Sequence, residues 1–166
     1  GKDFIIPGTA WQQVDEPSAD EIERIKALYY GEATFVDKCI GKLFDKLDAL
    51  NLWQDSIVVL LSDHGTQVMD HGNFGKGANN LRAYNTKINF RVNHPDMAQK
   101  SDIEALVQAH DVFPTLLGLL DIPVTSEGED AWSLVTGDRD KIREEAVIGW
   151  ASWAEGKAIG RASVRS

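Results

Sequence analysis

Apolar residues between positions 19 and 50 recur at the three- and four-residue intervals expected of a helix with one apolar face. They are Ile22, Ile25, Tyr29, Val36, Ile40, Leu43, Leu47 and Leu50. Just before them, Ser18 and Glu21 have the spacing of a capping box, in which each side chain binds the other's backbone amide. The pattern predicts one long helix over residues 19–50, ended by Asn51.

Residues 56–62 form a continuous β-branched and aliphatic run. Such a run is typical of a strand buried on both faces, as in a parallel sheet covered by helices. Residues 65–86 are rich in glycine and polar side chains and predict a long loop. A second strand is predicted at 87–92, one or two helices over 101–120 with Pro114 near a helix start, and a strand at 146–150. This alternation predicts an α/β fold.

Composition narrows the functions that the chain can have. Its 166 residues are enough for a hydrophobic core, and its net charge of −9 argues against nucleic-acid binding. The longest apolar run, 57–61, is too short to span a membrane. The single cysteine, Cys39, lies on the predicted apolar helix face, so we expect a buried structural thiol. An anionic substrate would need local positive charge from a metal ion or from lysine and arginine.

Asp63 and His64 directly follow the predicted buried strand. Ligands of open α/β sheets gather beyond the carboxyl ends of the strands, so these side chains are candidates for half of a metal site. An aspartate oxygen suits Ca²⁺ or Mg²⁺, and an imidazole suits Zn²⁺ or Mn²⁺. The alternative is a purely structural role, in which Asp63 caps a turn and His64 is an ordinary loop residue. The tripeptide alone does not decide between a metal site and this structural role.

The following loop carries further candidates. Asp70-His71-Gly72 repeats the tripeptide, and Lys76 stands between two glycines, where it could bring a positive charge close to a bound anion. The alternative for Lys76 is a solvated surface lysine. The loop is not a nucleotide-binding P-loop, because Gly77 stands where serine or threonine is needed.

Four segments together resemble the sulfatase family of the alkaline-phosphatase superfamily, in the family's order. The first is a Y-Y-x-E-A helix leading to V-D-x-x-I-G, and the second is S-D-H-G followed by D-H-G and G-K. The third is D-x-x-P-T-L-L, and the fourth is a Trp-Ser-Leu element. They lie at 29–41, 62–76, 111–117 and 131–134.

The resemblance implies part of an alkaline-phosphatase-like sheet flanked by helices, with residues 1–126 in the main domain and 127–166 beginning a smaller C-terminal region. It implies hydrolysis of a small-molecule or carbohydrate sulfate ester with the help of Ca²⁺, for which Zn²⁺ or Mn²⁺ are the alternatives. Asp63 and His64 would bind the metal, and Lys76 would bind sulfate and stabilise the leaving oxygen. His71 would contact substrate or, slightly favoured, brace the loop.

Three features depart from the family pattern. The C-x-P-x-R or S-x-P-x-R motif that supplies the nucleophile does not occur, nor does the usual pair of aspartates near the N-terminus, and residues 87–90 replace the common V-P-L-I. We therefore expect the chain to correspond to about the last third of a typical member and to be inactive alone. Relatives are often periplasmic or secreted, but the sequence does not determine the compartment of this chain.

Other functions stay open at this point. Phosphonate monoester hydrolases, phosphodiesterases and phosphoethanolamine transferases share the S-D-H-G element, usually with Zn²⁺ or Mn²⁺. A non-catalytic remnant domain is a second alternative. Five tryptophans suggest exposed apolar surface, which would favour self-association.

Overall fold

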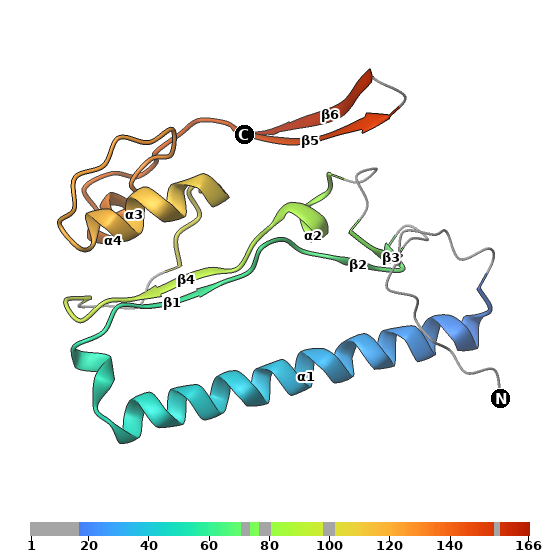
Figure 1. Ribbon diagram of the computed structural model, residues 1–166, viewed down its shortest axis with the longest axis horizontal. Helices are drawn as coiled ribbons and strands as arrows, with labels where there is room; N and C mark the ends of the chain where they lie inside the picture. The colour runs from blue at the N-terminus through green and yellow to red at the C-terminus, as the bar shows by residue number, and fades with distance from the viewer. Residues whose placement is uncertain (1–16, 71–73, 77–80, 98–101, 155–156) are drawn as a thin grey trace. The chain divides into compact units, whose positions relative to one another are not determined.

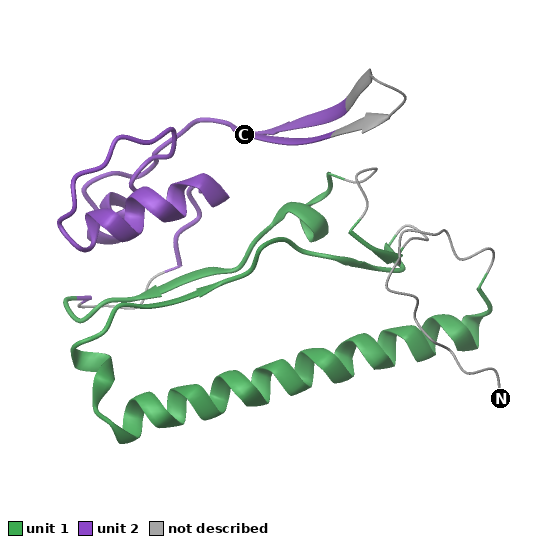
Figure 2. Cartoon of the chain, viewed as in Figure 1, with its two compact units in different colours: residues 1–96 green, residues 97–166 purple. Residues whose placement is uncertain are grey.

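The computed structural model describes residues 17–70, 74–76, 81–97, 102–154 and 157–166. The chain divides into two compact units, residues 1–96 and 97–166, coloured separately in Figure 2. This division differs from the predicted domain boundary after residue 126, which concerns the domains of a sulfatase and stays a prediction.

Unit 1 begins with α1, a helix over Ala19–Ala49 (Figure 1). Its capping box is formed: Ser18 Oγ accepts from the Glu21 amide at 3.3 Å, and Glu21 Oε2 accepts from the Ser18 amide at 2.9 Å. At the other end Asn51 has a φ of 54°, a left-handed conformation that asparagine tolerates and that stops the helix. The predicted helix is confirmed at both ends.

The apolar face of α1 is exposed, contrary to the expectation that Cys39 is buried. The helix has no buried residue, Cys39 is exposed, and the side chain of Phe35 is 64% exposed. At its C-terminal end, Phe44 packs edge-to-face on Trp53 of η1 (Leu52–Gln54), with ring centroids 5.2 Å apart. The prediction for Cys39 was wrong because it assumed that another element covers this face, and none of the described elements does.

The strands of unit 1 form two small antiparallel sheets. β1 (Val58–Leu61) pairs with β4 (Phe90–Asn93), and β2 (Gln67–Val68) pairs with β3 (Phe74–Gly75). In the described pairings, therefore, the parallel neighbours expected for the first strand are not found. A parallel pair needs a crossover connection, whereas residues 62–89 carry a short hairpin and the four-residue helix α2 (Ala83–Thr86).

Burial of β1 also differs from the prediction. Its residues are half-buried to exposed, and Leu61 is 45% exposed, because β4 pairs along one edge and the described elements do not cover both faces. The predicted long loop over 65–86 was wrong in part, since it contains β2, β3 and α2. The second strand lies a few residues later than predicted.

Unit 2 contains η3 (Ala109–Asp111), α3 (Val112–Gly118), α4 (Trp132–Thr136), β5 (Ala146–Ala154) and β6 (Lys157–Arg165). The helix predicted over 101–120 is shorter than expected: α3 begins at residue 112 and places Pro114 in its first turn, where proline is tolerated. The predicted strand at 146–150 is confirmed, and β5 and β6 form an antiparallel hairpin. The buried core joins Ala131, Leu134 and Ile142.

None of the helices in the described part of the chain is long and apolar enough to cross a membrane.

Candidate functional site

The strand β1 is extended by one residue through a pair of backbone and side-chain hydrogen bonds at Ser62. Its amide donates to the Asn89 carbonyl at 3.0 Å, and its Oγ accepts from the Asn89 amide at 2.7 Å. Ser62 therefore fixes the point where the chain leaves the strand and Asp63 begins the turn.

Gly65 closes the same turn against α2. Its amide donates to the carbonyl of Asn85 at 2.9 Å, and a Cβ at this position would lie 1.9 Å from the carbonyl oxygen of Tyr84. Only glycine can approach α2 this closely. Ser62 and Gly65 thus fix Asp63 and His64 from both sides. Their hydrogen-bond partners, Asn89 and Asn85, could not be identified from the sequence pattern.

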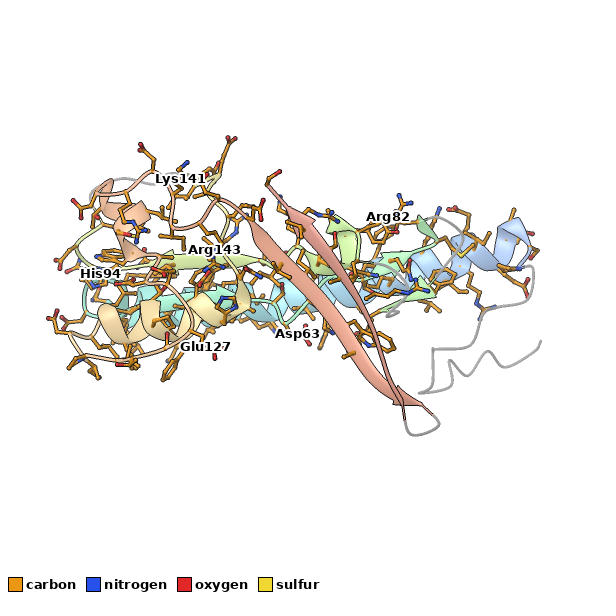
Figure 3. All side chains as sticks on the ribbon, turned by 90° about the horizontal axis from the view of Figure 1, so that it is seen from above. Asp63, Arg82, His94, Glu127, Lys141 and Arg143 are labelled. Carbon is orange, nitrogen blue, oxygen red and sulfur yellow. The ribbon has the colours of Figure 1, made fainter. Side chains whose placement is uncertain are left out.

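The side chains of Asp63 and His64 converge. Asp63 Oδ1 accepts from the His64 amide at 2.8 Å, while Oδ2 lies 3.2 Å from Nε2 of the His64 ring. Nδ1 of the same ring lies 2.6 Å from the carbonyl oxygen of Gly65. The Asp63 side chain, which is labelled in Figure 3, is 80% exposed.

Lys76 reaches this pair from the second hairpin. It directly follows β3, in which Gly75 has a φ of 80°, a conformation that favours glycine. The ammonium Nζ of Lys76 lies 2.9 Å from Nε2 of His64. The fold therefore brings together three of the four side chains that the sequence predicted.

These contacts favour one tautomer of His64. A lysine ammonium can only donate, so Nε2 accepts its hydrogen bond and the ring proton belongs on Nδ1, which donates to the Gly65 carbonyl. The Nε2 lone pair and a carboxylate oxygen of Asp63 then lie 3.2 Å apart. Two acceptors at this distance repel each other unless a cation lies beside them. The arrangement is suited to binding positive charge.

The donor set also fits a divalent metal ion, but incompletely. Histidines that bind metals usually donate their second ring nitrogen to a carbonyl or carboxylate, as Nδ1 does here. Asp63 and His64 supply two donors, and the part of the chain that the structure describes contains no group of three or more histidine, cysteine, aspartate or glutamate side chains suited to a metal. A complete site would need ligands beyond these two.

Asp70 has a structural contact of its own, in the turn after β2. Asp70 Oδ2 accepts from the Val68 amide at 2.9 Å and closes the turn after β2, in which Met69 has a φ of 68°. His71 lies outside the described residues, so its predicted role stays a prediction.

Unit 2 contains a buried polar network around Asp111, the first residue of the D-x-x-P-T-L-L segment at 111–117. Asp111, fully buried, accepts from Arg143 Nη2 at 2.5 Å and from the Gln108 and Glu129 amides at 2.6 and 2.9 Å. Thr115 Oγ1 donates to the Asp111 carbonyl at 2.6 Å and accepts from the Ala131 amide. The network explains the D-x-x-P-T part of the motif as a structural anchor.

Comparison with known proteins adds an independent line of evidence. The family model described as Sulfatase matches residues 7–122, more than half of the chain. An ulvan-active sulfatase of Formosa agariphila is 33% identical over 141 residues, which cover 77% of this chain and 26% of that protein. Arylsulfatase K of Gallus gallus is 29% identical over 109 residues, 66% of this chain and 20% of that protein.

A third relative has a broader name. The multifunctional alkaline phosphatase superfamily protein PehA of Trinickia caryophylli is 31% identical over 97 residues, 58% of this chain and 19% of that protein. The chain therefore spans about a quarter or less of the length of these relatives.

Proposed function

The chain belongs to the sulfatase family, and we propose that it supplies part of the active site of an enzyme that hydrolyses sulfuric esters. The observation that carries this proposal is the convergence of Asp63, His64 and Lys76 at the end of β1. A carboxylate, an imidazole and an ammonium in contact can bind a divalent metal and an anion next to each other.

Each side chain has a distinct role in this proposal. Asp63 Oδ2 and His64 Nε2 bind the metal, and the Gly65 carbonyl holds the imidazole in the tautomer with Nε2 free. A bound divalent metal supplies Lewis-acid polarisation of the sulfate oxygens. Lys76 binds a sulfate oxygen and stabilises the negative charge that develops on the leaving oxygen. His71 braces the loop or contacts substrate.

Members of the family generally use a divalent metal; for this chain we propose Ca²⁺, with Zn²⁺ or Mn²⁺ as alternatives. The nucleophile lies outside these 166 residues in this proposal, because they lack the C-x-P-x-R or S-x-P-x-R motif. The substrate is a small-molecule or carbohydrate sulfate ester. In the folded enzyme, β1 belongs to an alkaline-phosphatase-like sheet flanked by helices, and α1 is one of those helices.

A second candidate is favoured by the similarity to PehA, whose name places it in the wider alkaline phosphatase superfamily. Hydrolysis of a phosphonate monoester or phosphodiester would use the same carboxylate, imidazole and ammonium, since phosphate and sulfate oxygens make similar hydrogen bonds. A non-catalytic domain that keeps the fold is the third.

Metal and anion titrations of the purified chain test the proposal. Isothermal titration with Ca²⁺, Mn²⁺ and Zn²⁺, followed by sulfate or phosphate, is compared for the native chain, Asp63→Asn, His64→Ala and Lys76→Met. We expect weak metal binding that Asp63→Asn and His64→Ala each reduce at least about tenfold, because each removes one of two donors. Metal binding that both substitutions leave unchanged would contradict the site assignment.

Turnover and anion binding distinguish between the three candidate functions. We expect the chain alone to hydrolyse 4-nitrophenyl sulfate no faster than Lys76→Met, because no nucleophile is supplied. Turnover above that control would show that the chain carries its own nucleophile. Tighter binding of phosphate than of sulfate at saturating metal would favour the second candidate, and binding of neither anion would favour a non-catalytic domain.

A further inference from the structure

The ammonium of Lys76 occupies the lone pair that a metal would need. Nζ lies 2.9 Å from Nε2 of His64, and the other ring nitrogen is committed to the Gly65 carbonyl at 2.6 Å. Zn²⁺ would bind an imidazole nitrogen at about 2.0–2.1 Å through the same lone pair. One lone pair cannot serve both cations, so the two positions exclude each other.

From this geometry we propose that Lys76 competes with the metal for His64 and is released from it when the metal binds. The inference rests on the proposed metal site at Asp63 and His64. If a metal bound to His64, the released ammonium would become available to an anion, so anion binding by Lys76 would follow metal binding. Lys76 would thus determine the order in which metal and anion bind, in addition to binding the anion itself.

The surroundings of Lys76 allow this exchange. Its side chain is exposed and directly follows a two-residue strand, so the ammonium is not held in a packed interior. His64 is held more firmly, by the Gly65 carbonyl and by the turn that Ser62 fixes. The imidazole therefore stays in place while its partner changes.

The competition predicts that removing Lys76 changes the metal affinity in the opposite direction from removing a metal-binding residue. Removing Lys76 increases metal affinity, because the metal no longer displaces a hydrogen-bonded ammonium. We expect Lys76→Met, which keeps the length of the chain but not the donor, to bind Mn²⁺ about three- to tenfold more tightly than the native chain, the gain expected for a partly exposed charged hydrogen bond.

The measurement is the Mn²⁺ concentration at which the His64 ring signals broaden to half their intensity in a heteronuclear NMR spectrum. The ring signals of His94 and His110 are internal references. Lys38→Met is the matched control, because Lys38 is an exposed lysine on α1 and the substitution changes the net charge equally. Each titration is run at about 0.1 and 0.5 M KCl, since salt screens long-range attraction more than it changes direct competition.

Every outcome decides the matter. A lower midpoint for Lys76→Met than for the native chain and Lys38→Met, at both salt concentrations, supports the competition. Equal midpoints, or a gain that disappears at high salt, overturn it; if Asp63→Asn still abolishes the broadening, the metal site itself stands. If His64 broadens in none of these proteins, the metal assignment fails and the competition fails with it.

Discussion

The carbonyl oxygen of Tyr84 lies 1.9 Å from the position that a Cβ at Gly65 would occupy. This contact, together with the hydrogen bond from the Gly65 amide to Asn85, joins the turn after β1 to α2. The orientation of Asp63 and His64 therefore depends on a backbone contact that only glycine permits.

Substitution of Gly65 by alanine is expected to destabilise unit 1 by about 1–3 kcal/mol, because a methyl group forces the two backbones apart. Urea unfolding followed by tryptophan fluorescence measures the loss. Gly41→Ala is the matched control: nothing lies within 4 Å of its Cβ and it is inside α1, so it should stabilise by about 0.5–1 kcal/mol. Equal effects of the two substitutions would show that the contact with Tyr84 does not constrain the turn.

Ser62→Ala removes the acceptor of the 2.7 Å hydrogen bond from the Asn89 amide. We expect a loss of about 0.5–1.5 kcal/mol, the usual net contribution of such a bond, and weaker metal binding, because the turn that follows is less constrained. Ser62→Thr keeps the hydroxyl and should restore both properties. An alanine variant that loses stability but keeps native metal affinity would limit Ser62 to a structural role.

Asp111→Asn is expected to destabilise unit 2 by about 3–5 kcal/mol, because it leaves the largely buried Arg143 without its counter-charge. Thermal unfolding by circular dichroism and urea unfolding measure the effect. A double-mutant cycle with Arg143→Met should recover part of the loss, since the double variant buries no unpaired charge.

The control for this pair is Lys141→Met. Lys141 pairs with Glu144 at 2.6 Å, but both side chains are mostly exposed, so its removal should cost at most about 1 kcal/mol. A loss at Lys141 as large as that at Asp111 would contradict the view that burial gives the Asp111–Arg143 pair its importance.

Ser18→Ala should cost about 1 kcal/mol and unwind the first turn of α1, because the Glu21 amide loses its acceptor. Amide hydrogen exchange over residues 19–23 reports the local effect, and Ser18→Asp should restore protection. Unchanged exchange in the alanine variant would indicate that the box contributes nothing measurable to this long helix.

The structure could be predicted from the sequence where the signal was local. The capping box and Asn51 bound α1 within a residue of its observed ends, since both act through neighbouring backbone groups. The 146–150 strand followed from its apolar composition in the same way. Asp63, His64 and Lys76 were found as candidates from residue type and spacing, without knowledge of their contacts.

Burial and pairing were decided by tertiary structure, and there the predictions failed. The apolar pattern of α1 and β1 indicated which faces could be buried, but Cys39 and Leu61 are exposed because burial depends on a partner element that no local pattern specifies. Strand direction depends likewise on the path of the 62–89 connection.

The sequence by itself determined the family to which this chain belongs and the residue types available for its chemistry. Only the tertiary structure placed Lys76 on His64 and Arg143 on Asp111, pairs 12 and 32 residues apart. Such contacts arise from turns and packing across the fold, and their distances decide which lone pairs are open to a cation.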